Sequence, residues 1–295
     1  MPPEAVSQPV DVVPAAAAPE IEPVAPGPAS LPPRPRFDGV GHLLLTAGRA
    51  GILLGTLALF WAGTFLFSLS ALPVLHVAIR DPIRRRRLTQ RFVSGCFAAI
   101  HGLLERLGIY HRRWQGPPLP QTPAVLVANH PSFLDFTAIA AACPTLCCVV
   151  KPLLMRNPLV GRVLRACGHV DGRSETLAGA ESTFAELRQR LAEGFPVLIF
   201  PEGTRSPTGG LWAFRRGPFR LACVAQVPLR LLVLDCFPSA LGKDVSIWQY
   251  PRVAPTLTLE VQPDMPSAGR TAGSLRDECE QRVRERQALL ARARL

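Results

Sequence analysis

The sequence predicts an α/β domain preceded by a membrane-embedded helical segment, and three observations support this fold class. Short runs of branched apolar residues alternate with helical patterns beyond Pro123, which is typical of α/β domains. Residues 51–79 contain no Asp, Glu, Lys or Arg. Two polar motifs directly follow apolar runs, at the strand ends where open α/β sheets bind their ligands.

Residues 1–40 are predicted to form a disordered extension. Pro, Ala and acidic residues dominate up to residue 36, and this stretch has no aromatic residue and no apolar periodicity. It differs from a secretory signal, because Glu4, Asp11 and Glu20 precede any apolar run.

Residues 41–80 are predicted to be embedded in a membrane. The uncharged stretch is long enough to cross a bilayer, and a soluble core helix of this length would have a polar face. Gly63 and Pro73 could instead divide it into two shorter helices that lie in one leaflet. The sequence leaves both arrangements open.

Residues 81–115 are predicted to hold a basic cluster and an amphipathic helix. Arg80, Arg84–Arg87 and Arg91 follow the apolar segment, so the positive-inside rule places the domain that follows them in the cytoplasm, on the inner (cytoplasmic) membrane. The same arginines would be attracted to anionic headgroups by about 1 kcal/mol each. Apolar residues recur with a helical period over 88–109, on a face that either packs on the domain or lies in the membrane interface.

Residues 116–295 are predicted to form the α/β domain. The expected strands are 124–128, 146–150, 196–200, 229–234 and 256–261, and the expected helices are 132–142, 157–167, 175–193, 217–226 and 274–292.

Net charge and cysteine spacing limit the kinds of molecule that the protein is expected to bind. A charge of +11 would also suit a nucleic-acid binder. The basic residues gather beside the apolar segment and over 270–294, without a nucleic-acid module, so we expect membrane lipids and no nucleic acid. The eight cysteines lack paired C-x-x-C spacing and are expected to be buried thiols. The six histidines are not at metal-ligand spacing, so we expect no metal.

The first motif is Asn129-His130-Pro131-Ser132-Phe133-Leu134-Asp135. His130 is a candidate general base, and Asp135 is close enough in sequence to fix its tautomer and stabilise the imidazolium. A substrate that brings its own hydroxyl would replace the serine of a Ser-His-Asp triad, which gives direct acyl transfer. A structural alternative is that Ser132 and Asp135 form a helix-capping box.

The second motif is Phe200-Pro201-Glu202-Gly203-Thr204-Arg205-Ser206. Gly203 lets the backbone approach a ligand closely. Arg205 offers a planar fork suited to a phosphate, and Thr204 offers a hydroxyl beside it.

The two motifs in this order resemble the glycerolipid acyltransferase family, whose members esterify lysophosphatidic acid and related acceptors. The likeness covers roughly residues 85–235 and includes Lys151–Gly168 and Phe214-Arg215-Arg216-Gly217-Pro218-Phe219. It implies a mixed sheet flanked by helices and an N-terminal two-helix membrane motif. It further implies that Arg205 and Arg173 bind a glycerol phosphate and that Glu202 helps to position the acceptor. The motif that contains Arg173 is one residue shorter than in the family, and Val227-Pro228 keeps only the first half of the family's last motif.

The resemblance implies an enzyme that transfers a fatty acyl group from acyl-coenzyme A or acyl carrier protein to 1-acyl-sn-glycerol-3-phosphate, giving phosphatidic acid. No cofactor is expected beyond this donor substrate. An alternative is the same chemistry on another lysolipid, such as a lyso-ornithine lipid or a specialised glycolipid. A catalytically silent membrane scaffold is a further alternative. A lipid hydrolase is disfavoured by the lack of a G-x-S-x-G nucleophile elbow.

Overall fold

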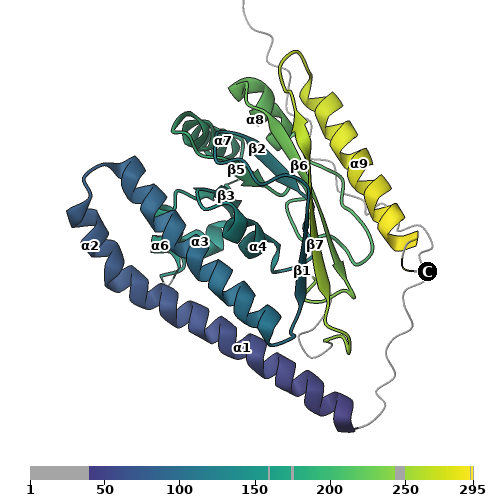
Figure 1. Cartoon of the computed structure of the whole chain (residues 1–295). Helices are drawn as coiled ribbons and strands as arrows, with labels where there is room; N and C mark the ends of the chain where they lie inside the picture. Colours follow the sequence, from purple (N-terminus) through teal and green to yellow (C-terminus); the bar gives the residue numbers. More distant parts are fainter. Residues whose placement is uncertain (1–39, 159, 174–175, 243–249, 293, 295) are drawn as a thin grey trace, which may run out of the picture.

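The computed structural model describes residues 40–158, 160–173, 176–242, 250–292 and 294, and its elements are labelled in Figure 1. The extension predicted to be disordered, residues 1–40, lies outside the described residues except for residue 40. A seven-stranded sheet forms the centre, in the order β1-β7-β6-β2-β5-β3-β4. The strands are β1 (His111–Gln115), β2 (Val125–Ala128), β3 (Cys147–Val150), β4 (Val170–Asp171), β5 (Val197–Ile199), β6 (Leu229–Phe237) and β7 (Thr256–Met265).

The sheet is mixed, as the family resemblance implies. Neighbouring strands from β6 to β4 run parallel, whereas β7 is antiparallel to β6 and β1 is parallel to β7. The helices are α1 (Val40–Leu69), α2 (Ala71–Ala78), α3 (Pro82–Arg106), α4 (Asp135–Ala142), α5 (Pro152–Arg156), α6 (Gly161–Ala166), α7 (Leu177–Ala192), α8 (Gly217–Ala225) and α9 (Ala272–Arg292).

All five predicted strands are present, and two strands were not predicted. β1 carries the sequence His-Arg-Arg-Trp-Gln and is the outermost strand, beside β7, so it lacks the apolar pattern of a buried strand. β4 has two residues, which is too short for any periodicity to show. The helix predicted over 157–167 is present only as α6, and α5, which was not predicted, precedes it because Pro152 begins α5 and Asn157 ends it in an extended conformation.

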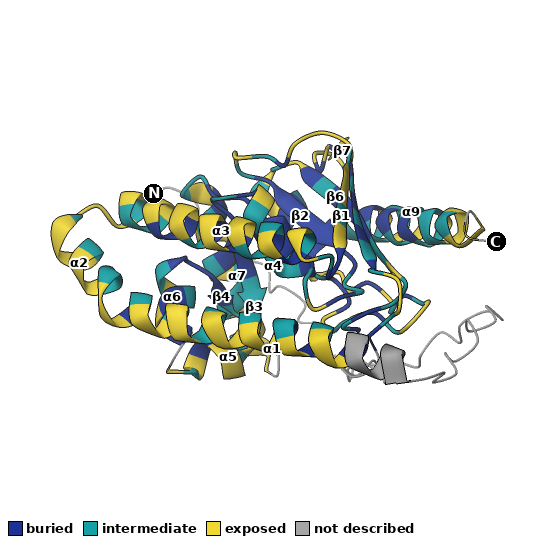
Figure 2. Ribbon diagram, turned by 60° about the horizontal axis from the view of Figure 1, so that its bottom comes forward, coloured by how far each residue is buried: buried dark blue, intermediate teal, exposed yellow. Residues whose placement is uncertain are grey.

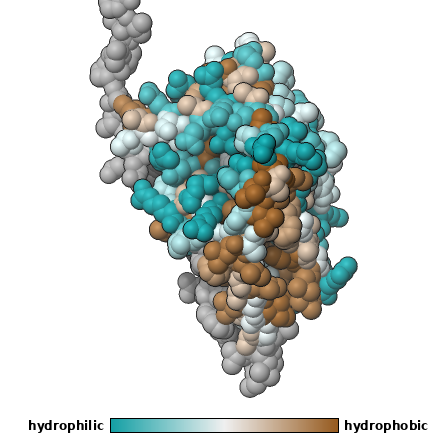
Figure 3. Space-filling view, turned by 90° about the vertical axis from the view of Figure 1, so that its left-hand side faces the viewer, coloured by the Kyte–Doolittle hydropathy of each residue, from teal (hydrophilic) through white to brown (hydrophobic). Residues whose placement is uncertain are grey.

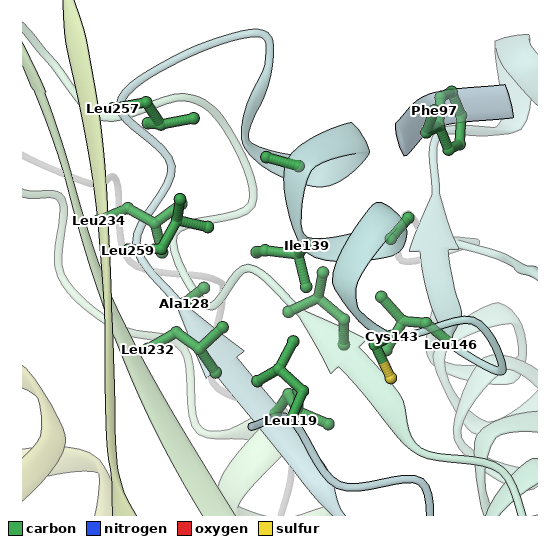
Figure 4. Close-up of a cluster of buried hydrophobic side chains, with 14 of the residues drawn as sticks. Phe97, Leu119, Ala128, Ile139, Cys143, Leu146, Leu232, Leu234, Leu257 and Leu259 are labelled. Atoms are coloured by element: carbon green, nitrogen blue, oxygen red, sulfur yellow. The ribbon is translucent and has the colours of Figure 1, made fainter. Parts of the chain in front are cut away.

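Two apolar clusters cover the two faces of the sheet. Along β2, Leu126 and Ala128 face the cluster that contains α3 and α4, while Val125 and Val127 face the cluster that contains α7, α8 and α9. This alternation is the period of a strand that is buried on both faces. Figure 4 shows the first cluster, where Leu232, Leu234 and Leu259 lie beside Ile139 of α4.

Helices α1, α2 and α3 form an antiparallel hairpin along one side of the domain (Figure 1). The helical stretch Thr46–Ala78 is apolar and long enough to cross a membrane, yet α1 lies against the domain. Phe60 stacks on Phe97 at 5.8 Å between ring centroids, and Phe67 stacks on Phe92 at 4.6 Å. Many residues of the hairpin are exposed (Figure 2).

The apolar side chains of α3 do not all face the domain. Phe97 and Leu104 are buried in the core, whereas Leu88 and Phe92 are exposed. Part of its buried face is polar: Gln90 Nε2 donates to the carbonyl oxygens of Leu146 at 3.2 Å and Cys167 at 2.8 Å. Of the two alternatives predicted for this amphipathic helix, packing on the domain is confirmed for one side, and a membrane-interface position for the exposed side stays a prediction.

The arginine cluster is likewise divided between the domain and the solvent. Arg86 forms an ion pair with Glu193, and its guanidinium lies over the Phe195 ring, 5.3 Å from the centroid. Arg87 lies over the same ring at 5.5 Å. These two side chains dock α3 on the domain, while Arg84 and Arg91 are exposed.

Candidate active site

The two polar motifs emerge side by side at one edge of the sheet. β2 ends at Ala128 and β5 at Ile199, and the two strands are parallel neighbours with Val127 opposite Ile199. Their carboxyl ends therefore meet, as the position of both motifs after strands predicted. His130 follows β2 and Glu202 follows β5, so residues 72 apart in sequence come into contact.

His130 and Asp135 form the expected pair. His130 Nδ1 lies 2.8 Å from Asp135 Oδ2, and the His130 ring stacks on Phe200 with 4.2 Å between centroids. The His130 side chain is 20% exposed and the Asp135 side chain is 0% exposed. An acceptor at Nδ1 holds the ring proton there, which leaves Nε2 as the basic nitrogen on the accessible part of the ring.

Asp135 also makes the contact with Ser132 that the capping alternative predicts, although the N-cap of α4 is Leu134, which has no side-chain cap hydrogen bond. Its Oδ2 accepts a hydrogen bond from the Ser132 main-chain N–H at 2.7 Å, and Ser132 Oγ accepts from the Leu134 N–H at 3.3 Å. Burial raises the pKa of the Asp135 carboxyl, and the hydrogen bond from His130 opposes that rise. One carboxylate oxygen therefore serves the helix start and the histidine together, so the two interpretations coexist.

Glu202 holds the main chain of His130 in place. Its Oε1 accepts from the His130 N–H at 2.9 Å and from Ser206 Oγ at 2.7 Å, and its Oε2 accepts from the Trp212 N–H at 3.0 Å. The residue is only 3% exposed, and burial raises the pKa of its carboxyl. These contacts are all with protein groups, and direct contact between Glu202 and an acceptor stays a prediction.

Arg205 is anchored by one nitrogen of its guanidinium. Its Nη1 donates to the carbonyl oxygens of Leu241 at 3.0 Å and Gly242 at 2.9 Å. A guanidinium has five N–H donors, so Nε and Nη2 still have three to offer a ligand. Thr204 beside it is half-buried, and Gly203 is exposed with φ at 70°.

Arg173 does not join this group. It follows β4, two strands away from β5, which places it about 10 Å along the sheet at the usual strand spacing. Its Nε donates to Asp171 Oδ2 at 3.0 Å, and the side chain is 53% exposed. The hydrogen bond that Arg173 donates to Asp171 raises the pKa of Arg173. Lys151 is closer to the motifs, exposed at the end of β3 beside β5.

Three contributors to the site were not predicted. Ser206 Oγ accepts from the His130 N–H at 3.1 Å, and the Ser206 N–H donates to the His130 carbonyl at 2.8 Å. Its place in the second motif was the available signal. Leu241, whose carbonyl binds both Arg205 and the Phe133 N–H, has φ at 56°, which is uncommon for a leucine. Phe200, the ring under His130, was predicted only as part of a strand.

The cysteines and the other buried histidines have structural surroundings. Burial raises the pKa of the Cys147 thiol to about 12 and lowers the pKa of His169 to about 4. His169 Nδ1 accepts from the Cys148 N–H at 3.0 Å, and His101 Nε2 lies 3.0 Å from Thr137 Oγ1. Among the described residues, no three His, Cys, Asp or Glu side chains form a metal-binding group.

Comparison with known proteins identifies the family. A family model described as Acyltransferase matches residues 111–231. A 1-acyl-sn-glycerol-3-phosphate acyltransferase of Chlamydomonas reinhardtii is 32% identical over 234 residues, which cover 71% of this chain and 68% of the relative. The chain belongs to the acyltransferase family. It is therefore an acyltransferase enzyme, as the two motifs and the His130–Asp135 pair predicted.

Other relatives of this acyltransferase extend beyond the matched region. The human 1-acyl-sn-glycerol-3-phosphate acyltransferase beta is 32% identical over 55% of this chain and 59% of its own length. The chloroplastic enzyme LPAT1 of Arabidopsis thaliana is 29% identical over 58% of this chain and 48% of its own length. This chain thus spans about half of these two relatives.

A solved structure shares the fold. The 1-acyl-sn-glycerophosphate (LPA) acyltransferase PlsC of Thermotoga maritima superposes with a TM-score of 0.61 at 20% identity, over 84% of this chain and 96% of that one. The mixed sheet with flanking helices is therefore the fold of the acyltransferase. The apolar α1 and the family together indicate that the enzyme associates with membranes.

Proposed function

We propose that this acyltransferase transfers a fatty acyl group from an acyl thioester to the free hydroxyl of 1-acyl-sn-glycerol-3-phosphate, giving phosphatidic acid in phospholipid biosynthesis. The observation that carries the proposal is the 2.8 Å pair between His130 Nδ1 and the fully buried Asp135, on the same sheet edge as Arg205. The names of the relatives support the acceptor.

The reaction uses His130 as base and then as acid. Nε2 takes the proton of the acceptor hydroxyl as that oxygen attacks the thioester carbonyl carbon, and Asp135 stabilises the imidazolium that forms. The tetrahedral intermediate then collapses and the carbon–sulfur bond breaks. The proton on Nε2 passes to the leaving thiolate, which departs as coenzyme A or as acyl carrier protein thiol. His130 is thereby neutral again, and no covalent acyl-enzyme forms.

The acceptor phosphate binds to Arg205 in this proposal. Nη1 is held by the carbonyls of the 241–242 turn, which fixes the guanidinium plane, and Nε and Nη2 supply the fork that suits a phosphate. Because Arg205 is three residues beyond Glu202, which binds the His130 main chain, the phosphate is held next to the base. Lys151 and Arg173 are two further cations, each located just after the carboxyl end of a strand. Arg173 is the more distant from Arg205.

The hairpin lies in one leaflet of the inner (cytoplasmic) membrane in this proposal, with the catalytic domain facing the cytoplasm. Ala50 and Leu53 of α1 are buried against the domain, and Arg49 Nη1 donates to the Arg252 carbonyl at 2.8 Å. A spanning α1 would have to break these contacts. Figure 3 shows apolar side chains gathered on this side of the molecule; among the large exposed ones on α1 to α3 are Leu57, Leu59, Phe65, Leu66, Leu69, Val74, Val77, Leu88 and Phe92.

The orientation can be tested by labelling Ala47→Cys in a Cys96→Ser background. Ala47 is exposed near the N-terminal end of the apolar stretch, the end that a spanning α1 would place opposite the catalytic domain. If the hairpin stays in one leaflet, an impermeant maleimide should fail to label position 47 from the side of sealed membranes opposite the catalytic domain. Labelling from that side would show that α1 spans.

The activity can be tested by acyl transfer from labelled acyl-coenzyme A or acyl carrier protein in isolated membranes. Lysophosphatidic acid, monoacylglycerol and lyso-ornithine lipid are offered as acceptors. We expect transfer to lysophosphatidic acid, and a loss of about 10² to 10⁴-fold in His130→Ala, which removes the general base. His111→Ala, at an exposed histidine of β1, is the matched control and should keep full activity.

Preference for a phosphate-free acceptor would overturn the proposed substrate while keeping the chemistry. Equal activity of His130→Ala and wild type would overturn the mechanism. A folded, inserted wild type that acylates none of the three acceptors would favour the silent scaffold.

A further inference from the structure

A second arginine lies against the turn that carries Arg205. The Arg215 guanidinium covers Gly203: a β-carbon built on Gly203 would lie 2.9 Å from Arg215 Cζ and 3.1 Å from Nη2. The Arg215 main-chain N–H donates to the Pro201 carbonyl at 3.0 Å, so the two loops are joined. A glycine with φ at 70° at this position provides the space that the guanidinium occupies.

No partner within the described part of the chain accounts for the Arg215 guanidinium. Among the residues described, no carboxylate forms an ion pair with Arg215, and no side-chain hydrogen bond of Arg215 is found. The acid that contacts the neighbouring Phe214 N–H, Glu280, is bonded to Arg284 at 2.8 Å. Glu202, in the same turn, is buried and accepts three protein hydrogen bonds.

The surroundings of Arg215 are consequently positive and open to solvent. Arg205 follows Gly203 by two residues and keeps three free donors, and Arg215 is exposed. The guanidinium groups of Arg205, on this turn, and Arg215, which lies against it, have charges of the same sign, and an anion bound beside them would offset their repulsion. A phosphate group, with several acceptor oxygens, satisfies both forks.

We propose that Arg215 is a phosphate-binding residue of this acyltransferase, acting with Arg205 across the Gly203 turn. This inference rests on the proposed function, because both substrates named there can bring phosphate. The phosphate belongs to the lysolipid acceptor or to the nucleotide part of coenzyme A. Arg215 binds and positions it while His130 does the proton transfer.

The test measures binding without turnover, in His130→Ala protein held in lipid nanodiscs. The probes are lysophosphatidic acid, monoacylglycerol, coenzyme A and pantetheine, so that each phosphate ligand has a phosphate-free counterpart. Arg215→Ala should raise the Kd of one phosphate ligand about tenfold, which is about 1.4 kcal/mol, and leave its counterpart unchanged. Arg215→Lys, which keeps the charge but not the fork, should give a smaller rise.

The probe that weakens identifies the source of the phosphate. Arg216→Ala is the matched control, since Arg216 is the adjacent exposed arginine, and it should change each Kd less than twofold. The inference fails if neither phosphate ligand weakens, if the phosphate-free counterpart weakens equally, or if Arg216→Ala has the same effect. Unfolding midpoints of all variants exclude loss of fold as the cause.

The same proteins separate this inference from the proposed function. The acyl-transfer assay with intact His130 decides the reaction, and the Kd values decide Arg215. Transfer by the wild type with no change in Kd overturns the inference alone. A Kd effect in a chain that transfers no acyl group overturns the proposed function and keeps the phosphate site.

Discussion

Asp135→Asn separates the catalytic role of Asp135 from its helix-capping role. The amide is the same size as the carboxylate, and its oxygen in place of Oδ2 can still accept from His130 Nδ1 and the Ser132 N–H. The variant therefore keeps the geometry and removes the negative charge. A carboxylate and an imidazolium about 4 Å apart attract by about 4 kcal/mol at an effective dielectric constant of about 20. Loss of that attraction should lower kcat about 10³-fold.

Folding stability should respond in a different way from activity. Burial raises the pKa of Asp135 in the folded protein above its value in the unfolded chain. The free energy of unfolding therefore falls as the pH rises from the unfolded-state pKa through the folded-state pKa. Asp135→Asn lacks this penalty, although its amide N–H₂ replaces Oδ1, which has no hydrogen-bond partner among the described residues. The variant should thus unfold within about 2 kcal/mol of wild type at neutral pH, since an unpaired polar group costs about 1–3 kcal/mol. In acid, the wild-type carboxyl is protonated in both the folded and the unfolded protein. The variant should therefore be less stable relative to wild type in acid than at neutral pH.

The assay pairs acyl-transfer rates with denaturant unfolding for Asp135→Asn and Ser132→Ala. Ser132→Ala removes the hydrogen bond at the start of α4 and leaves the His130 pair, so it should cost about 1 kcal/mol of stability and only a few-fold in rate. If the two variants lose activity and stability in the same proportion, the capping role suffices and the catalytic reasoning is refuted.

Three further predictions concern the turn after β5 and the apolar hairpin. Glu202→Gln should lower kcat about tenfold or more with KM within twofold, because Glu202 contacts the His130 main chain; a rise in the acceptor KM alone would show that it contacts substrate. Gly203→Ala should weaken binding of the phosphate ligand as Arg215→Ala does, because its β-carbon would displace the Arg215 guanidinium. It should also cost about 1–2 kcal/mol of stability, because alanine is strained in the left-handed backbone conformation. Unchanged Kd values would contradict this prediction. Leu66→Asp on α1 should reduce flotation with liposomes, since Asp in a bilayer costs about 3 kcal/mol, whereas Gln281→Asp on the distant α9 should not.

Local parts of the site could be predicted from the sequence. His130 and Asp135 are five residues apart, so a single turn after a buried strand decides whether they meet. The alternation of apolar runs placed both motifs at strand ends, and parallel pairing of β2 with β5 then brought them together. The predicted strands could be recognised for the same reason, because the apolar residues of each strand indicate that it is buried.

Contacts that depend on main-chain atoms could not be predicted. Arg205 is anchored by carbonyl oxygens 36 and 37 residues away, and any residue type supplies a carbonyl. The family resemblance implied that Glu202 helps to position the acceptor, and direct contact with a substrate stays a prediction. The inward orientation of the Glu202 side chain follows from three donors, two of them backbone N–H groups, which leave no side-chain signature.

The amphipathic pattern of α3 failed as a guide for a similar reason. A helical period shows that apolar residues recur, and it does not show which neighbour each one faces. Phe97 contacts both Phe60 of α1 and Phe136 of α4, whereas Phe92 stacks on Phe67 of α1 and stays exposed. Gln90 is buried because the carbonyl oxygens of Leu146 and Cys167 accept its hydrogen bonds. A polar residue inside and an apolar one outside both contradict the simple pattern, and both are explained by particular partners.

The described contacts fix the orientation of His130 from three directions. Asp135 holds the ring at Nδ1, Glu202 and Ser206 accept from its N–H, and the Ser206 N–H donates to its carbonyl. Phe200 lies flat against the ring and limits its rotation. A base held in this way needs no reorganisation when the hydroxyl proton arrives, which is where preorganised sites gain rate. The two buried carboxylates thus both bind the histidine residue, and in the proposed reaction the guanidinium groups of Arg205 and Arg215 bind the substrate phosphate.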